Sequence, residues 1–232
     1  MTKTNQQKVK DFLINNGVII VMFILVIYTG FTSDNFFTKN NFMNILMNMS
    51  SRLVFELGIA GCVITAGCDL SAGRMIGFGA CISGMLLQRM DYSGKFFPDM
   101  QPLNVFVVAL IAMLVCAAFG TVTGFFIAYL NVPPFIATLA MMEIVYGIGL
   151  IVTNATPLGG YVEQYTNVSN GKFLGINYLI WIAIIVAAIT WFIFNMTRHG
   201  KYMYAIGGNP QAAEVAGVPV KLTLILIYMK AA

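Results

Sequence analysis

Charged residues are scarce in this sequence, which has 13 lysines and arginines and 9 aspartates and glutamates among its 232 residues. They make up 9% of the chain, against roughly 25% in soluble domains, and 59% of the residues are hydrophobic. This balance excludes a water-soluble globule. Several long apolar runs instead predict an all-α, polytopic integral membrane bundle, because alternating ten-residue segments typical of a membrane barrel are missing.

Residue types that carry chemistry are also few. One histidine, His199, excludes a histidine cluster, and the cysteines lie in or beside apolar runs without metal-ligand or disulfide spacing. The motifs Gly-x-x-x-x-Gly-Lys-[Ser/Thr], His-Glu-x-x-His and Gly-x-Ser-x-Gly do not occur. We therefore expect no catalytic residue, no metal, no cofactor and no enzyme activity. The basic residues lie beside the apolar runs and not on one polar face, so the net charge of +4 does not indicate a nucleic-acid partner.

The apolar runs predict about six complete transmembrane helices and the start of a seventh. They cover approximately residues 17–31, 53–66, 75–87, 103–130, 135–153 and 178–194, and the seventh begins at 222. Lysines ahead of the first run place residues 1–16 in the cytoplasm, and six crossings return the chain there at Arg198. The eight apolar residues before Lys230 are too few to cross a bilayer, which suggests a truncated or frame-shifted gene or an incomplete gene model.

Two of these runs are short for a hydrocarbon layer of about 30 Å. Residues 53–66 and 75–87 either extend into the polar junction between them, or that junction is a break inside the membrane. Ahead of them, the helical spacing of apolar residues in 32–51 predicts an interfacial helix on the outer face. Residues 154–175 are predicted to form a polar outer loop.

The junction itself, Thr65 to Arg74, combines two charges with glycines. Asp69 and Arg74 are costly near lipid, so they should pair or face a polar cavity, while Gly67 and Gly73 permit a backbone break. Two interpretations of this junction are equally favoured. In one, its residues line a translocation pathway, and in the other, Asp69 caps the following helix through Ser71. Glu56 and Glu143 are the other acids in apolar runs, and the simpler interpretation places them at span ends or in the bundle interior.

Glycines also recur four residues apart, at Gly73 and Gly77 and again at Gly120 and Gly124. Such pairs let helices approach closely, so they indicate packing. The sequence from Asn131 to Pro134 predicts a rigid turn that ends one helix before the next begins.

A short helix with both ends marked is predicted inside the last polar passage. Asn209 suits the N-cap and Pro210 the first helical position, and Gly217 suits the position after the helix. Taken by itself, this pattern is typical of an ordinary loop helix between two membrane spans. Its residues from Tyr204 to Val218, however, resemble the cytoplasmic coupling loop of ABC-type sugar importer permeases of the ribose and galactose/methyl-galactoside branch. Thr65 to Gly73 and Asn131 to Leu139 resemble further patterns of that family.

The resemblance implies a permease subunit of the bacterial plasma (inner) membrane, with a transmembrane permease domain over 17–195, a cytoplasmic coupling loop over 196–221 and an incomplete helix over 222–232. It implies a separate ATPase subunit that binds ATP, a second permease chain and an extracytoplasmic sugar-binding protein. The residues that it assigns to ATPase coupling are Gly208, Asn209, Pro210, Ala212, Ala213, Glu214 and Gly217. Those that it assigns to the translocation pathway or to a structural motif are Thr65, Gly67, Asp69, Ser71, Gly73 and Arg74.

Transport by alternating access of galactose, methyl-galactoside or ribose is the expected function, with the galactose branch the closer match. Two alternatives remain. A proton-coupled secondary transporter would use Glu56, Asp69 or Glu143 to carry the proton. A truncated fragment that does not transport would still bind the ATPase through residues 209–217.

Overall fold

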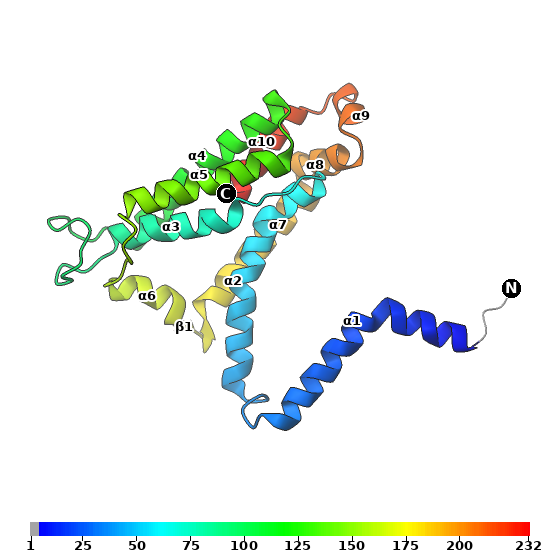
Figure 1. Cartoon of the computed structure of the whole chain (residues 1–232), viewed down its shortest axis with the longest axis horizontal. Helices are drawn as coiled ribbons and strands as arrows, with labels where there is room; N and C mark the ends of the chain where they lie inside the picture. The colour runs from blue at the N-terminus through cyan, green and yellow to red at the C-terminus, as the bar shows by residue number, and fades with distance from the viewer. Residues whose placement is uncertain (1–4) are drawn as a thin grey trace. The chain divides into compact units, whose positions relative to one another are not determined.

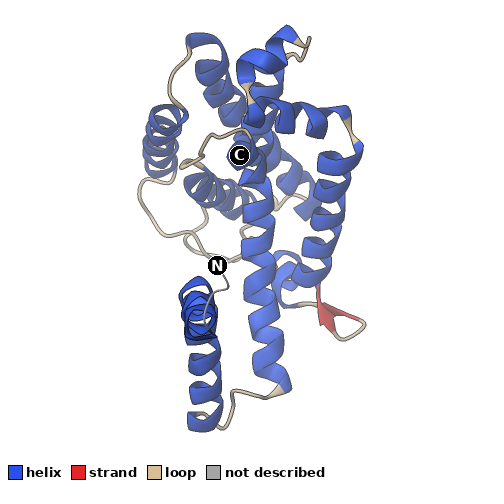
Figure 2. Ribbon diagram, turned by 90° about the vertical axis from the view of Figure 1, so that its right-hand side faces the viewer, coloured by secondary structure: helices blue, strands red, loops and turns tan. Residues whose placement is uncertain are grey.

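The computed structural model describes residues 5–232, with side chains from residue 13 onward except that of Asn15. Residues 1–4, which belong to the predicted cytoplasmic segment 1–16, lie outside the described residues. The chain divides into two compact units after Asn48, and each is considered by itself. Helices account for nearly all of the regular structure, with one small hairpin (Figure 2).

The first unit contains α1 (Asn5–Thr32) and the beginning of α2 (Lys39–Ile64). The second contains the rest of α2 and the remaining elements (Figure 1). These are α3 (Ala72–Leu86), α4 (Val105–Leu130), α5 (Pro134–Val152), α6 (Glu163–Asn170), β1 (Lys172–Phe173), β2 (Ile176–Asn177), α7 (Tyr178–Met196), α8 (Arg198–Gly208), α9 (Pro210–Val215) and α10 (Val220–Ala231).

Within the described residues, four helices are long and apolar enough to cross a membrane: α2, α4, α5 and α7. The apolar parts Asn16–Thr32 and Ala72–Leu86 are shorter. A helical membrane bundle is therefore confirmed, whereas the number of six crossings plus a seventh start stays a prediction. The predicted interfacial helix within 32–51 is wrong, because its apolar residues belong to α2, and this extension makes the second predicted span long enough.

The predicted outer loop and the predicted coupling loop both contain more helix than expected. Residues 154–175 include α6 and the first strand of the hairpin, in which Lys172 pairs with Asn177 and Phe173 with Ile176. Residues 196–221 include the eleven-residue α8 ahead of α9. Both regions are polar on average, and composition alone gave no sign of regular structure.

The turn between α4 and α5 confirms its prediction. Asn131 adopts the left-handed conformation with φ 53° and its N–H bonds to Phe126 O, which ends α4. Pro134 is the first residue of α5, where its missing N–H leaves no hydrogen bond unmade.

Helix α10 lies against α4 along most of its length (Figure 1). A side chain could not be added at Gly120 without striking the backbone oxygen of Tyr228, and a Cβ at Gly124 would lie 2.7 Å from Ile225 Cα. This pair of glycines therefore permits the close approach, as predicted. The same interpretation of Gly73 and Gly77 is wrong, because among the described residues a Cβ at either would meet no atom within 4 Å.

The apolar core forms where α3, α4 and α5 meet. Met75, Phe78 and Ile82 of α3 contact Cys116 of α4 together with Met141 and Val145 of α5, and all six are buried. The spacing of the α3 residues at three and four positions defines the buried stripe of this helix. Phe78 also meets Phe119 edge to face, with ring centroids 5.6 Å apart.

Candidate functional site: the α8–α9 segment and the 65–74 break

The base of the α8–α9 segment is α8, which is anchored by apolar side chains. Thr197 caps it through an oxygen that accepts from the N–H of Gly200 at 3.3 Å. Met203 and Ile206 are buried at 0% and 2% exposure, and Met203 packs in a cluster with Cys62, Ile227 and Tyr228. Since these partners come from α2 and α10, α8 is attached to membrane helices and does not lie free.

The short helix α9 projects from this base, and its ends are built as the sequence predicts. Asn209 Oδ1 accepts from the N–H of Ala212 at 2.9 Å, and Pro210 follows as the first helical residue. At the other end, the N–H of Val218 bonds to Ala213 O at 3.0 Å around Gly217, whose φ of +83° favours glycine.

Exposure differs sharply along α9. Ala213 is buried, while the predicted coupling residues Gly208, Asn209, Pro210, Ala212, Glu214 and Gly217 are exposed. Val215 is 91% exposed although it is apolar. An apolar side chain beside a carboxylate, held on a short rigid helix, is suited to contact another protein surface.

One titratable group lies at the start of α8. His199 Nε2 is buried and, among the described residues, has no hydrogen-bond partner. Burial, with a smaller contribution from the positive charge of Lys230, lowers the pKa of this imidazole below its usual value of 6.5. Protonation of His199 is therefore disfavoured in the packed state of this segment.

The second predicted motif, Thr65 to Arg74, forms a break between α2 and α3. Ala66 has a positive φ of 57°, and the N–H of Gly67 bonds back to Cys62 O at 2.9 Å. A Cβ at Gly67 would lie 2.5 Å from the hydroxyl of Tyr228, which itself donates to Cys68 O at 3.5 Å. The glycine is thus needed because α10 comes close to the broken backbone.

The two charges of the break have separate partners. Asp69 Oδ1 accepts from the N–H of Ser71 at 2.9 Å and from its hydroxyl at 2.6 Å, as the simpler prediction expects, but the side chain of Ser71 caps no backbone N–H of α3. The guanidinium of Arg74 lies 4.1 Å from the ring centroid of Tyr146 on α5. Sequence reasoning did not find Tyr146, because a lone tyrosine in an apolar run carries no signal.

The structure brings the two predicted motifs together. A Cβ at Gly207, near the end of α8, would strike the carbonyl oxygen of Ile64 and would lie 3.6 Å from Thr65 Cα. The C-terminal end of α8 therefore presses on the backbone where α2 stops and the break begins. Gly207 of α8 is therefore in close contact with the backbone at the start of the 65–74 segment.

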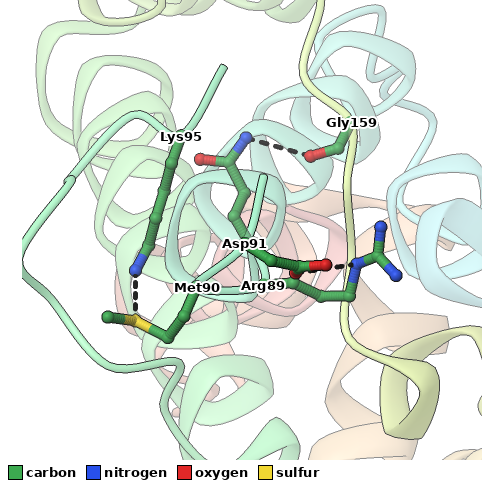
Figure 3. A network of polar contacts seen from close by, with 6 residues as sticks. Arg89, Met90, Asp91, Lys95 and Gly159 are labelled. Atoms are coloured by element: carbon green, nitrogen blue, oxygen red, sulfur yellow. Dashed lines mark hydrogen bonds and ion pairs between the residues drawn. The ribbon is translucent and has the colours of Figure 1, made fainter. Parts of the chain in front are cut away.

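The opposite end of the second unit is held by a polar network that the sequence did not indicate. Gln88, which is 1% exposed, donates to Gly159 O at 3.0 Å (Figure 3). Its side-chain oxygen also accepts from the N–H of Phe96 at 2.6 Å. Arg89 Nε lies 3.6 Å from Asp91, and Lys95 reaches the sulfur of Met90. This network joins the connection after α3 to residues 154–175, which were predicted to form an outer loop.

The two acids in apolar helices are not in the bundle interior. Glu56 on α2 and Glu143 on α5 both have exposed side chains. The predicted interior positions are therefore wrong for the described part of the chain. Glu143 lies near the middle of α5 and not at a span end.

Comparison with known proteins relates the chain to transport permeases. Residues 41–232 match the family model described as branched-chain amino acid transport system / permease component. The galactose/methyl galactoside import permease protein MglC of Escherichia coli (strain K12) is 39% identical over 235 residues, which cover 98% of this chain and 70% of that protein. The corresponding protein of Haemophilus influenzae is 40% identical over 236 residues, with 99% and 70% covered.

A second group of relatives carries a different sugar in its name. The ribose import permease protein RbsC of Escherichia coli (strain K12) is 30% identical over 223 residues, which cover 94% of this chain and 66% of that protein. No solved structure matches the chain significantly.

Proposed function

Because the chain belongs to the branched-chain amino acid transport system / permease component family, we propose that it is the membrane-spanning permease subunit of a bacterial ABC importer for a monosaccharide. The family description names amino acids, but the more similar relatives are named for galactose, methyl galactoside and ribose. Higher identity favours galactose or methyl galactoside over ribose, at 39% against 30%. The chain itself is not an enzyme, and a separate ATPase subunit binds and hydrolyses ATP.

The observation that carries this proposal is the exposed α9 on its anchored base. Glu214 and Val215 offer an acidic and an apolar contact for the ATPase, while α8 passes any displacement to the break at Thr65. ATP-driven movement of 209–217 would then shift α3 relative to α2 and alternate access to the pathway. The coupling residues and the pathway residues named above take these roles in the proposal.

The arrangement of loops supports the proposed topology. Residues 88–101 are hydrogen-bonded to the expected outer loop 154–175 at one end of the second unit, so both lie outside in the proposed topology. At the other end, Lys221 lies 5.1 Å from the ring centroid of Tyr129, next to the turn from Asn131 to Pro134. Six crossings place residues 1–16 and the coupling loop 196–221 in the cytoplasm and 17–195 in the plasma membrane, with 222–232 entering a further span.

Two partners complete the proposal. A second copy of the permease chain would share one pathway, and an extracytoplasmic sugar-binding protein would deliver the sugar to the outer face. The network around Gln88 supports the latter, because it holds the outer loops as a firm surface. The alternative of a proton-coupled transporter is favoured by one observation, the exposed Glu143 within an apolar helix.

Charge reversal of Glu214 tests the coupling role. Glu214→Arg should reduce co-purification of the ATPase subunit at least tenfold and reduce sugar uptake in parallel, since the substitution replaces an exposed acid on the docking helix. Glu163→Arg, the same reversal on an exposed residue of α6 at the other end, is the matched control. If co-purification survives both Glu214→Arg and replacement of Gly208, Asn209 and Pro210, the docking role is wrong.

A further inference from the structure

Arg74, Glu143 and Tyr146 form one polar face of α3 and α5, and we propose that this face lines the water-filled route of the sugar at mid-depth in the membrane. Arg74 and Glu143 would contact the sugar hydroxyls, and Tyr146 would position the guanidinium. The inference rests on the proposed function, since it assumes a sugar as the transported molecule. It extends the predicted pathway from the 65–74 segment onto α5.

The depth of this face follows from the register of α3 along α5. Tyr146 lies more than three turns into α5, roughly 18 Å from Pro134 at 1.5 Å per residue. Arg74 stacks on that ring, and a Cβ at Gly149 would lie 3.7 Å from Phe78, so the two helices run in parallel with this offset. Helix α3 therefore begins partway along α5, as Figure 1 shows. The end of the break, at Arg74, is level with the part of α5 about 18 Å from its start.

Contacts of α10 link the break to α4 as well. Tyr228 donates to Cys68 O in the break, and its own backbone oxygen faces Gly120 of α4. Gly120 is about 15 Å along α4 from Leu130, where the helix ends before the turn from Asn131 to Pro134. Through Tyr228, the break at Cys68 is therefore linked to a part of α4 well away from the end of that helix.

The face is open in the second unit. Arg74 and Glu143 are exposed and Tyr146 is 42% exposed, and a Cβ at Gly73, Gly77 or Gly147 would meet no atom within 4 Å. Glu143 and Tyr146 are three residues apart and so share one side of α5, opposite the buried stripe of Thr138, Met141 and Val145. Ionisable side chains at this depth almost always face a water-filled cavity or other protein and not lipid.

The chemistry of the face suits a neutral polyol. A guanidinium offers several fixed N–H donors and a carboxylate accepts from hydroxyl groups, so together they complement neighbouring hydroxyls of a sugar ring. The ring of Tyr146 holds the guanidinium by a cation–π contact, which leaves the outward N–H groups available. Few contacts at such a site also keep binding weak enough for release.

Water accessibility tests the location directly. In a variant with Cys62, Cys68, Cys81 and Cys116 changed to Ala, Glu143→Cys should react with a charged, water-soluble methanethiosulfonate at least tenfold faster than Ile185→Cys, and added galactose should slow the reaction. Ile185 is the matched control because it is 55% exposed near the middle of α7, among apolar residues. If the cysteine-free chain is absent from membranes, Gly77→Cys in the native chain replaces Glu143→Cys, and the native chain is its reference.

Measurement of sugar uptake by Glu143 variants shows whether this residue contacts the sugar or is only exposed to water. Glu143→Gln should reduce uptake at saturating galactose about tenfold, the size expected for a lost charged hydrogen bond. The amount of chain in the membrane and the co-purified ATPase should not change, and Glu56→Gln, the matched exposed acid on α2, should transport normally. Glu143→Asp should recover part of the rate.

The outcomes distinguish this inference from the proposed function. ATP-dependent uptake with an unreactive Glu143→Cys and normal transport by Glu143→Gln would overturn the polar face and leave the importer intact. Uptake that is driven by a proton gradient, and that needs no ATPase, would instead overturn the importer. If Glu143→Cys reacts but neither ribose nor galactose slows the reaction, the face is exposed to water but does not contact the sugar, and the inference is wrong.

Discussion

Two glycine pairs with the same spacing have opposite surroundings in this molecule. Gly120 and Gly124 lie under the backbone of α10, whereas Gly73 and Gly77 have open space where a side chain would be. The spacing of four residues places both pairs on one helix face, but it does not say whether another helix covers that face. Helix α10 packs over the first pair, whereas the second pair lies beside the polar residues Arg74 and Tyr146.

The difference shows how one membrane bundle uses glycine for two purposes. Where α10 meets α4, the missing side chains let two backbones pack closely and fix the position of Tyr228 against the break. Where α3 begins, they leave room beside charged groups. We expect substitutions at the first pair to act on stability and substitutions at the second to act on transport.

The largest effect is expected from a bulky residue on the packed side. Gly120→Leu should lower the free energy of unfolding by about 3 kcal/mol, because the side chain would strike the backbone of Tyr228 and separate α10 from α4. Gly77→Leu should change it by less than about 1 kcal/mol, since the space there is open. Thermal unfolding in detergent, followed by reaction of a thiol dye with buried Cys62 and Cys116, measures both. Equal losses in the two variants would mean that the face at Gly77 is also covered.

Substitution of glycine by alanine should change the stability in opposite directions at the two glycine pairs. Gly77→Ala should stabilise α3 by about 0.5–1 kcal/mol, because alanine has the better helix propensity and nothing is displaced. Gly124→Ala should instead cost about 1–2 kcal/mol, since its methyl would lie 2.7 Å from Ile225 Cα. The same thermal assay applies. Stabilisation by Gly124→Ala would show that α10 does not pack closely on α4.

The sequence predicts the helical bundle well because its main signal is local. Apolar runs gave the cores of α4, α5 and α7 closely, and cap residues gave both ends of α9. The beginning of α2 was predicted as a separate interfacial helix, because polar asparagines among its residues lower the hydropathy, although helical spacing continues through Ile45 and Met49. Helix propensity and the helical spacing of apolar residues together predict the start of α2, which hydropathy alone does not.

The candidate site was only partly predictable, since its important relations are between distant segments. The local sequence predicts the capping roles of Asn209, Pro210 and Gly217. It also predicts the bond between Asp69 and Ser71, which are two residues apart. The stack of Arg74 on Tyr146, and the contact of Gly207 with Ile64, depend on helix register, which no local pattern contains. Gln88 was missed for the same reason, because its partners lie in loops that only the fold brings together.

Removal of a tyrosine hydroxyl should affect stability differently near the covered glycine pair, at Tyr228, and near the open pair, at Tyr146. Tyr228→Phe should cost about 1 kcal/mol, because the buried hydroxyl loses its hydrogen bond to Cys68 O beside the break. Tyr146→Phe should change stability by less than about 0.5 kcal/mol, since the ring that holds Arg74 remains. Thermal unfolding again distinguishes them. A larger loss in Tyr146→Phe than in Tyr228→Phe would show that the open side depends on a hydroxyl contact.

The smallest effect, a dependence on pH, is expected from His199 beside the packed α10. Its pKa in the folded chain is lower than the unfolded value of 6.5, so the folded state binds fewer protons than the unfolded state as the pH falls below 6.5. The stabilisation is therefore fully present above pH 6.5 and is lost as the pH falls through the folded pKa. The unfolding temperature should fall more between pH 7.5 and 5.5 in the native chain than in His199→Gln, which cannot take up this proton. Equal falls in both chains would mean that His199 is as accessible to protons when folded as when unfolded, and that the α8 base is less tightly packed against α2 and α10 than its buried Nε2 implies.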